Sequence, residues 1–412
     1  MRITRRARRR VVGMMAAAWW AVVWAPLEAL RQPPTVPPGM PPSTQDVPLA
    51  TRRPNSEPLR VVVAGMVHGH VDGFLAGAVK RQDIEIVGIA EPERTLFDTY
   101  AKKYALDAKL YHADLEDALQ VTQPQAVLVY TNTFEHRRVV EVSAKYASGA
   151  RRASTTGLQP LAVMMEKPLA VSTEDAQAIA ETAAKAKIPL IVNYFTTWEA
   201  SRWAAYNAVS RGEIGEVRKV VTHDGHSGPK EIGVGPEFLG WLTDPKLNGG
   251  GALYDFGCYG ADFMTWLMNG KRPMTVTAVT QQIKPDIYPK VEDEATIVLT
   301  YREAQAILQA SWNWPFGRSD VEVYGKTGTV FARGPDEIEE RRGGEKAAKQ
   351  VHATALKEPG NDPIAYLRAV ALEGMRPEGP GSLEINVVVA EILAAARESA
   401  RTGRTVKMEA GR

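Results

Sequence analysis

The chain has 412 residues, 44% hydrophobic and 24% charged, an ordinary composition for a soluble protein with enough apolar material for two domains. The formal net charge of +2 is unevenly spread, because residues 1–30 hold six arginines and one glutamate and carry +5, which leaves about −3 for the remainder. That remainder gives no argument for nucleic-acid or membrane-surface binding, and the single cysteine, Cys258, excludes an internal disulfide.

Residues 1–30 have the pattern of an export signal. An arginine-rich head precedes an apolar run, 11–25, that is too short to span a bilayer comfortably. Adjacent arginines favour the twin-arginine route, with general secretion and a retained anchor or a misassigned start as alternatives. Residues 31–58 are dense in proline and predict an extended linker. We therefore expect a periplasmic or otherwise exported protein that has no membrane contact after signal removal.

Residues 59–185 alternate between apolar runs and amphipathic segments. The runs that predict buried strands are 59–65, 84–91, 126–132 and 161–168. The segments that predict helices are 70–81, 92–106, 115–120, 135–147 and 173–187. This alternation predicts an α/β domain with a doubly wound parallel sheet of the Rossmann type, which binds dinucleotides.

Residues 186–412 are richer in strand patterns. After a run at 188–195, strand-like segments follow at 216–225, 275–283, 294–301, 304–314 and 319–333, and an amphipathic helix at 385–403 closes the chain. We expect a C-terminal α+β domain with a large, mainly antiparallel open sheet, and we assign the substrate to it.

The turn after the first predicted strand, "AGMVHGH", is a candidate phosphate-binding turn. Gly65 fits the first glycine of G-x-G-x-x-G, but the second and third positions are Val67 and His70. Glu91 ends the second strand 26 residues later, where an acid can accept hydrogen bonds from ribose hydroxyls and disfavours a 2′-phosphate. We expect NAD rather than NADP, with His68 in the groove. A plain turn and a solvated Glu91 are the alternatives.

Two further segments fix a family resemblance. "EKPLA" places Glu166 and Lys167 at the end of a predicted parallel strand, and "GGGALYDFGCYGAD" begins at Gly249. With "VEDEATIVLTY" and "YGKTGTV" in the same order, the chain resembles the Gfo/Idh/MocA oxidoreductases over about residues 59–408.

The resemblance implies a dinucleotide domain joined to an α/β domain whose open sheet supports homodimers or homotetramers. It places Lys167 near the nicotinamide and the reacting hydroxyl, with Asp255 beside it and Tyr259 as the proton-transferring residue. Many members have histidine at the position of Tyr259, so the branch resembles glucose-fructose oxidoreductase and dihydrodiol dehydrogenase. The residues expected at the cofactor are Gly65, Val67, His68, Glu91, Asn132, Glu166 and Lys167.

Hydride transfer from an alcohol also requires a base for the hydroxyl proton. A phenol with a pKa of about 10 is a poor base, so we expect Lys167 to lower the pKa of Tyr259. On one helix, Asp255, Tyr259 and Asp262 would share a stripe. The alternative is that Asp255 caps the helix and Tyr259 belongs to the core, and we expect Cys258 and Asp262 to be structural.

The candidate substrate residues are His223, Asn193 and Trp314. Histidine and tryptophan in "THDGHSG" and "SWNWPFG" could line a carbohydrate pocket or pack on the sheet. His223 and His226 have a metal-like spacing without a convincing third ligand, so we expect no metal.

These observations favour an exported NAD(P)-dependent oxidoreductase of a sugar or polyol, with a tightly held cofactor that a second substrate recycles. One alternative is an NAD-dependent glycoside hydrolase that oxidises, eliminates and re-reduces, in which Tyr259 or His223 handles protons. Another is a nucleotide-binding protein without catalysis, which the intact set of Lys167, Asp255 and Tyr259 argues against.

Overall fold

The computed structural model describes residues 57–149 and 161–408. The predicted export signal, 1–30, and all but the last two residues of the predicted linker, 31–58, lie outside the described residues. Within the described ranges, no helix has the length and apolar character that crossing a membrane requires.

The N-terminal half contains a six-stranded parallel sheet in the order β3-β2-β1-β4-β5-β6. The strands are β1 Leu59–Ala64, β2 Ile84–Ala90, β3 Tyr111–His112, β4 Ala126–Val129, β5 Ala162–Glu166 and β6 Leu190–Asn193. Strands β4 and β5 are buried throughout because helices cover both faces, which explains their continuous apolar sequences. The predicted doubly wound sheet is confirmed, and β6 extends it beyond residue 185.

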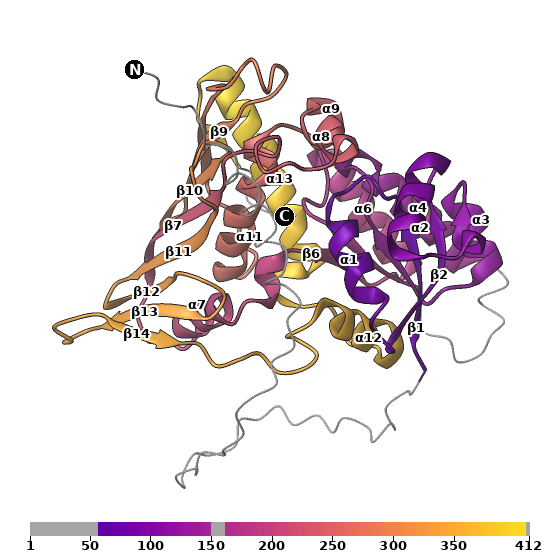
Figure 1. Ribbon diagram of the computed structural model, residues 1–412. Coiled ribbons are helices and arrows are strands. Elements are labelled where there is room, and N and C mark those ends of the chain that lie inside the picture. The colour runs from indigo at the N-terminus through magenta and orange to yellow at the C-terminus, as the bar shows by residue number, and fades with distance from the viewer. Residues whose placement is uncertain (1–56, 150–160, 409–412) are drawn as a thin grey trace, which may run out of the picture.

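Helices flank this sheet on both faces (Figure 1). They are α1 His70–Ala78, α2 Arg94–Tyr104, α3 Leu115–Thr122, α4 His136–Ser148 and α6 Thr173–Ala186, with the short helices η1 Ala108–Leu110 and η2 Thr133–Glu135. The side chains of Asp114 and Ser172 cap α3 and α6 by accepting backbone N–H bonds. Helix α12, Pro363–Glu373, returns from the C-terminal half and packs Ile364, Leu367 and Val370 into the core of this sheet.

The C-terminal half contains a nine-stranded sheet in the order β14-β13-β12-β11-β7-β10-β9-β8-β15. Its strands are β7 Val217–Gly225, β8 Thr275–Gln281, β9 Glu294–Thr300, β10 Gln305–Ser311, β11 Arg318–Gly325, β12 Gly328–Ala332, β13 Glu337–Arg342, β14 Lys349–His352 and β15 Val406–Lys407. Only the β7–β10 pair is parallel within this sheet, so the predicted mainly antiparallel sheet is confirmed.

One face of the second sheet is covered by helices. The helices of this half are α7 Ala200–Ser210, α8 Pro236–Leu242, α9 Pro245–Asn248, α10 Ala252–Asp255, α11 Gly257–Leu267 and α13 Leu383–Thr402, with η3 Phe195–Trp198 and η4 Gly379–Gly381. Helix α13, yellow in Figure 1, contacts α6 and β6 on one side and α11 and β8 on the other. The two sheets therefore share one continuous core.

The sequence predicted one helix for the segment that carries Asp255 and Tyr259, but the structure has two. Helix α10 ends at Asp255, and α11 begins at Gly257 after a break at Phe256. Every residue of α11 is buried, and a Cβ on Gly260 would clash with Thr222 on β7. The close approach of α11 to the sheet therefore needs glycine at position 260.

Candidate active site

Lys167 and Asp255 form a buried ion pair where the two halves meet. Lys167 follows the end of β5, and its Nζ donates to Asp255 Oδ1 at 2.6 Å and to the Asp255 backbone carbonyl at 2.8 Å. Trp312 Nε1 donates to the other carboxylate oxygen at 3.0 Å. A fixed ammonium group thus lies at the carboxyl edge of the parallel sheet, which is where ligands bind in such folds.

Both members of this pair are charged. Burial alone would lower the pKa of Lys167, but the attraction of Asp255 outweighs burial and raises that pKa above its ordinary value. Burial alone would raise the pKa of Asp255, but the charge and hydrogen bond of Lys167 lower it. The side chains are 6% and 8% exposed, so each charge depends on the other for its stabilisation.

Tyr259 lies beside the ammonium group but is not made more acidic by it. Lys167 Nζ is 5.0 Å from the centroid of the Tyr259 ring, which also packs against Tyr194 and Phe195. Burial, with the nearby Cys258 and Asp255, holds the pKa of Tyr259 well above its ordinary value. The expectation that Lys167 lowers this pKa is therefore wrong, because burial dominates it, and Tyr259 is a neutral phenol.

The predicted phosphate-binding turn lies between β1 and α1. Gly65 has a positive φ of 77°, and a Cβ there would lie 2.6 Å from Thr131 Cγ2, so the cradle requires glycine. Glu91 is buried at the end of β2 and accepts Met66 N at 2.7 Å and Glu93 N at 3.0 Å. The turn, the acid and the start of α1 fit the phosphates and ribose of a dinucleotide.

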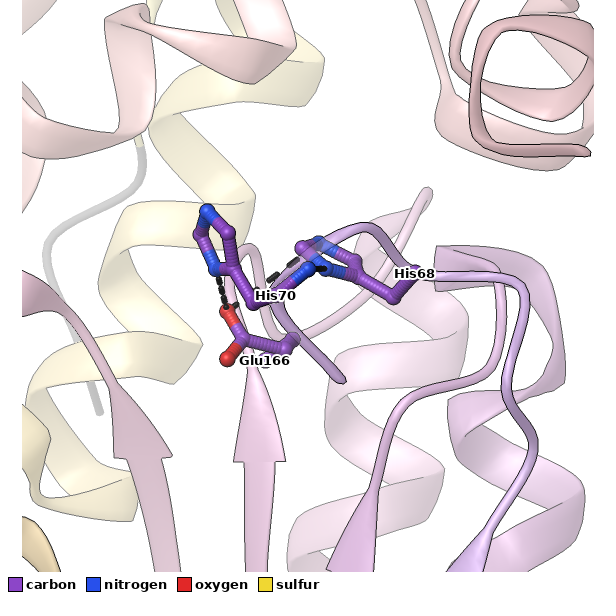
Figure 2. A group of neighbouring side chains, drawn as sticks. All are labelled: His68, His70 and Glu166. Carbon is purple, nitrogen blue, oxygen red and sulfur yellow. Dashed lines mark hydrogen bonds and ion pairs between the residues drawn. The ribbon is translucent and has the colours of Figure 1, made fainter. Parts of the chain in front are cut away.

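Two histidines of this turn face Glu166 at the end of β5 (Figure 2). His70 Nδ1 lies 2.9 Å from Glu166 Oε2, and His68 Nε2 lies 4.0 Å from the same oxygen. Burial lowers the pKa of His68 well below its ordinary value, so it is neutral. Asn193 Nδ2 donates to Glu166 Oε1 at 3.4 Å, which brings this predicted substrate residue to the same group.

His68, His70 and Glu166 also lie close enough together to bind a metal ion. However, His68 Nδ1 accepts the backbone N–H of His70 at 3.3 Å, which leaves the ring proton on Nε2, the atom that faces Glu166. A metal-bound histidine instead donates from its second nitrogen, so this arrangement fits a hydrogen-bonded groove better than a metal site.

The remaining predicted cofactor residues are Val67 and Asn132. The Val67 carbonyl accepts Trp241 Nε1 from α8 at 3.0 Å, and a Cβ on Gly69 would lie 2.9 Å from the Phe238 ring. Helix α8 of the C-terminal half therefore covers the turn. Asn132 follows β4, and its Oδ1 accepts Glu135 N at 3.1 Å, which caps η2.

His223 lies on the side of the second sheet that faces away from the ion pair. Its neighbours on β7, Thr222 and Asp224, point to the helix-covered face, since Thr222 contacts Gly260 on α11 and Asp224 pairs with Arg202 on α7. Side chains alternate along a strand, so His223 points to the opposite face. The structure therefore does not bring this candidate to Lys167.

Trp314 shares that opposite face. Its ring lies 3.0 Å from the position of a Cβ on Gly225, which has the same strand phase as His223. The residues that do reach the ion pair are Trp312, through Asp255, and His226, whose ring packs 4.9 Å from that of Phe256. His226 and Trp312 occur in the same two segments, THDGHSG and SWNWPFG, as the predicted His223 and Trp314. They differ from these only in which face of the sheet they point to, and the sequence does not show that.

His223 belongs to a second group with metal-like spacing, together with Asp320 and Glu322. His223 Nδ1 lies 3.0 Å from Asp320 Oδ2. Arg333 Nη1 reaches Glu322 at 3.0 Å and Asp320 at 3.5 Å, and Arg318 Nε donates to Asp320 at 2.6 Å. The two guanidinium groups already neutralise these carboxylates, which leaves little reason for a metal ion.

A buried acidic cluster lies near Tyr259 on the helix-covered face, consisting of Glu199, Arg202, Asp224 and Asp262. Arg202 is 4% exposed and lies 3.3 Å from Glu199 Oε2 and 3.9 Å from Asp224 Oδ1. Burial raises the pKa of all three acids, that of Asp224 to about 7. One guanidinium therefore faces three carboxyl groups, of which Asp224 exchanges its proton near neutral pH.

Asp224 is expected to make folding less favourable as the pH rises. Its pKa of about 7 in the folded chain exceeds the ordinary value, so the folded state binds this proton more tightly than the unfolded state. The resulting stabilisation is complete below about pH 4 and is lost as the pH rises to about 7. Asp224→Asn should remove part of this fall in the free energy of unfolding, measured with denaturant at several pH values.

Asp320→Asn is the matched control for that experiment. Burial alone would raise the pKa of Asp320, but hydrogen bonds from His223 and Arg318 lower it to about 2. Its contribution is therefore complete above about pH 4 and is lost only in stronger acid. A fall between pH 4 and 7 that is as steep in Asp224→Asn as in the wild type would contradict the prediction.

The dinucleotide fold and the ion pair at its carboxyl edge together define an NAD-linked oxidoreductase, and sequence comparison agrees. Residues 59–194 match an oxidoreductase family with an NAD-binding Rossmann fold, and residues 203–331 match the GFO/IDH/MocA C-terminal domain. The two matches span more than half of the chain, which belongs to the Gfo/Idh/MocA oxidoreductase family.

Individual relatives are distant. A 1,5-anhydro-D-fructose reductase from Ensifer adhaerens is 21% identical over 63% of this chain and 72% of the relative. A trans-1,2-dihydrobenzene-1,2-diol dehydrogenase from Xenopus tropicalis is 29% identical over 36% of this chain and 42% of the relative. The crystal structure of an aldose-aldose oxidoreductase from Caulobacter crescentus, complexed with glycerol, superposes with a TM-score of 0.70 at 21% identity and covers 85% of this chain and all of that one.

Proposed function

We propose that the protein oxidises a hydroxyl group of a sugar or polyol, or reduces the corresponding carbonyl, with NAD as the hydride carrier. The observation that carries this proposal is the charged Lys167–Asp255 pair at the carboxyl edge of the NAD-binding sheet. The family, and relatives named for sugar derivatives, support this substrate class.

NAD, when bound, supplies the hydride acceptor. The two bonds to Asp255 use two of the three N–H donors of Lys167, which leaves one donor for a substrate oxygen. A fixed, desolvated ammonium stabilises the negative charge that develops on this oxygen as the hydroxyl proton leaves. Asp255 keeps Lys167 charged and oriented, and Trp312 fixes the carboxylate.

We also propose that the cofactor is held tightly and reduced again by a second substrate, and that the protein is exported. The arginine-rich head supports export, and an exported enzyme works where free nucleotide is scarce. The cover that α8 places over the phosphate-binding turn supports retention. Assembly through the open face of the nine-stranded sheet into a homodimer or homotetramer completes this proposal, supported by the half-buried residues that alternate along β9 and β10.

Trp241→Phe is expected to release the cofactor faster. The variant retains ring packing against Phe238 but loses the hydrogen bond to the Val67 carbonyl, which contributes about 1 kcal/mol, or roughly fivefold in the dissociation rate. Stopped-flow release of the reduced cofactor measures this rate. Trp203→Phe loses an equivalent bond, from α7 to the Thr197 carbonyl, and should leave the rate unchanged. Equal release rates in the two variants would contradict the role of α8.

The experiment that tests the function is to denature the purified protein and identify any released nucleotide. The native protein is then screened with sugars, polyols and aryl glycosides. Net reduction of the cofactor without bond cleavage supports the proposal. Release of the aglycone without net reduction would instead show the alternative, a glycoside hydrolase with transient oxidation, and no reaction with any of the three would overturn both.

A further inference from the structure

Tyr259 packs beside Lys167 of the ion pair and also lines a small cavity. The cavity has a volume of about 10 Å³, roughly the room that one water molecule needs, and Asp262 and Arg202 contribute to its wall. Tyr259 and Asp262 lie one turn apart on α11, while Arg202 comes from α7. Tyr259, whose ring lies beside Lys167, therefore shares this cavity with two members of the buried acidic cluster, Asp262 and Arg202.

Asp262 differs from the other members of the cluster because one of its buried carboxyl oxygens is unpaired within the described part of the chain. It is 2% exposed, and its Oδ1 has no hydrogen-bond partner among the described residues. An unpaired buried carboxyl oxygen costs about 1–3 kcal/mol, so a purely structural role for this side chain is unfavourable. Burial raises the pKa of Asp262 well above its ordinary value, and a neutral carboxyl group both accepts and donates a proton.

The cluster continues from Arg202 towards the surface. Arg202 Nη2 donates to Ser319 Oγ at 2.9 Å, and Ser319 Oγ donates to Asp224 Oδ1 at 2.8 Å. Ser319 is half-buried and adjoins the exposed Arg318. Asp224, with a pKa of about 7, is partly ionised at neutral pH and is an acceptor for a proton that arrives from within.

His226, another titratable group near the Lys167–Asp255 pair, is a poorer proton acceptor. His226 Nδ1 accepts the backbone N–H of Gly228 at 2.9 Å, so the ring proton of the neutral imidazole is on Nε2. Burial also lowers the pKa of His226. Tyr259 cannot retain a negative charge either, because burial disfavours its phenolate. A proton that reaches Tyr259 must therefore displace the proton already there.

We propose that Asp262 relays the substrate proton from Tyr259 to the Arg202–Asp224 group. This relay rests on the proposed oxidoreductase function. The substrate O–H bond breaks and its proton binds the Tyr259 oxygen, while the phenol's own proton passes through the cavity to Asp262 Oδ1. Asp262 releases its earlier proton to the cluster, where the Asp224 carboxylate takes it up. The electron pair of the broken C–H bond leaves with the hydride, so charge and electrons balance.

Asp262→Asn is the test, with the substrate found in the screen. The variant should lower kcat by on the order of 10²-fold with little change in KM, and it should raise the solvent deuterium isotope effect on kcat. Thr265→Val, on the same helix and equally buried, does not line the cavity and should leave kcat unchanged. If Asp262→Asn does not fold, Asp262→Leu, which removes the buried carboxyl altogether, should fold and show the same loss.

An infrared measurement on the resting protein separates the relay from the function. The wild type should show the carbonyl band of a protonated carboxyl group that Asp262→Asn lacks. A kcat retained in Asp262→Asn, or a band that is the same in both proteins, would overturn the relay while the oxidation stands. If the band behaves as expected but no sugar or polyol is oxidised, the proposed function is overturned, and the relay with it.

Discussion

Replacing Lys167 with methionine is expected to lower kcat by about 10³-fold, because the variant loses the ammonium that stabilises the developing oxyanion. Methionine has a similar length, but it has no donor for the substrate oxygen and leaves the buried Asp255 carboxylate without its counter-charge. Steady-state kinetics with the identified substrate measure the loss. Binding of NAD, followed by fluorescence, should change far less than kcat, since the turn and Glu91 remain intact.

Lys103→Met is the matched control. Lys103 pairs with Asp72 on the surface of the first domain, so its removal should affect neither kcat nor unfolding beyond the small effect of an exposed ion pair. Full activity of Lys167→Met with every substrate of the wild type would contradict the assignment of Lys167 to the reaction.

Asp255→Asn is expected to destabilise the fold as well as reduce activity. The amide leaves the Lys167 charge buried without a counter-charge, which costs about 3–5 kcal/mol in the free energy of unfolding at neutral pH. Burial then lowers the pKa of Lys167, and the deficit should shrink as the pH rises and the amine loses its proton. Denaturant unfolding at pH 7 and at a more alkaline pH measures both effects.

A double variant gives the sharper form of this test. Lys167→Met/Asp255→Asn removes both charges, so it should be more stable than Asp255→Asn alone. Stability losses that simply add would show that the two side chains do not depend on each other, contrary to the geometry.

Four strands of the first sheet could be predicted because they are mainly apolar, whereas the two-residue strand β3 could not. β1, β4 and β5 are buried on both faces, and such runs stand out from the amphipathic helices between them. Strand β14, with the sequence KQVH, is exposed at the edge of the second sheet, and its neighbour β13, with the sequence EIEERR, has one buried apolar residue, Ile338, so neither has a clear apolar pattern. β13 pairs with β12, and β14 pairs with β13, and the sequence pattern does not show these pairings.

The residues that face the substrate could not be predicted as well, because strand phase decides which face of the sheet each side chain points to. Of the three predicted residues, Asn193 reaches Glu166. The side chains of His223 and Trp314 lie on the open face. Trp312 and His226 approach the ion pair instead. A shift of one residue reverses the face, and a strand with polar residues in both phases does not reveal which face is covered. The predicted stripe on one helix also failed, because the break at Phe256 separates Asp255 from Tyr259.

The electrostatic prediction for Tyr259 depended on depth, which sequence does not give. Lysine, aspartate and tyrosine were correctly expected to lie together, but only the structure shows that Lys167 is bonded to Asp255 and that Tyr259 is 5% exposed. Burial then dominates the pKa of the phenol.

The most direct measurement of the central claim uses the substrate labelled with deuterium at the carbon that bears the reacting hydroxyl. Both proteins are stopped at the same time, at which the wild type has completed a single turnover, and the nicotinamide is recovered and analysed by mass spectrometry. The account predicts that the wild type transfers the label to the nicotinamide ring and that Lys167→Met transfers almost none. Product formation by the wild type with an unlabelled nicotinamide, or equal labelling by the two proteins, would contradict it.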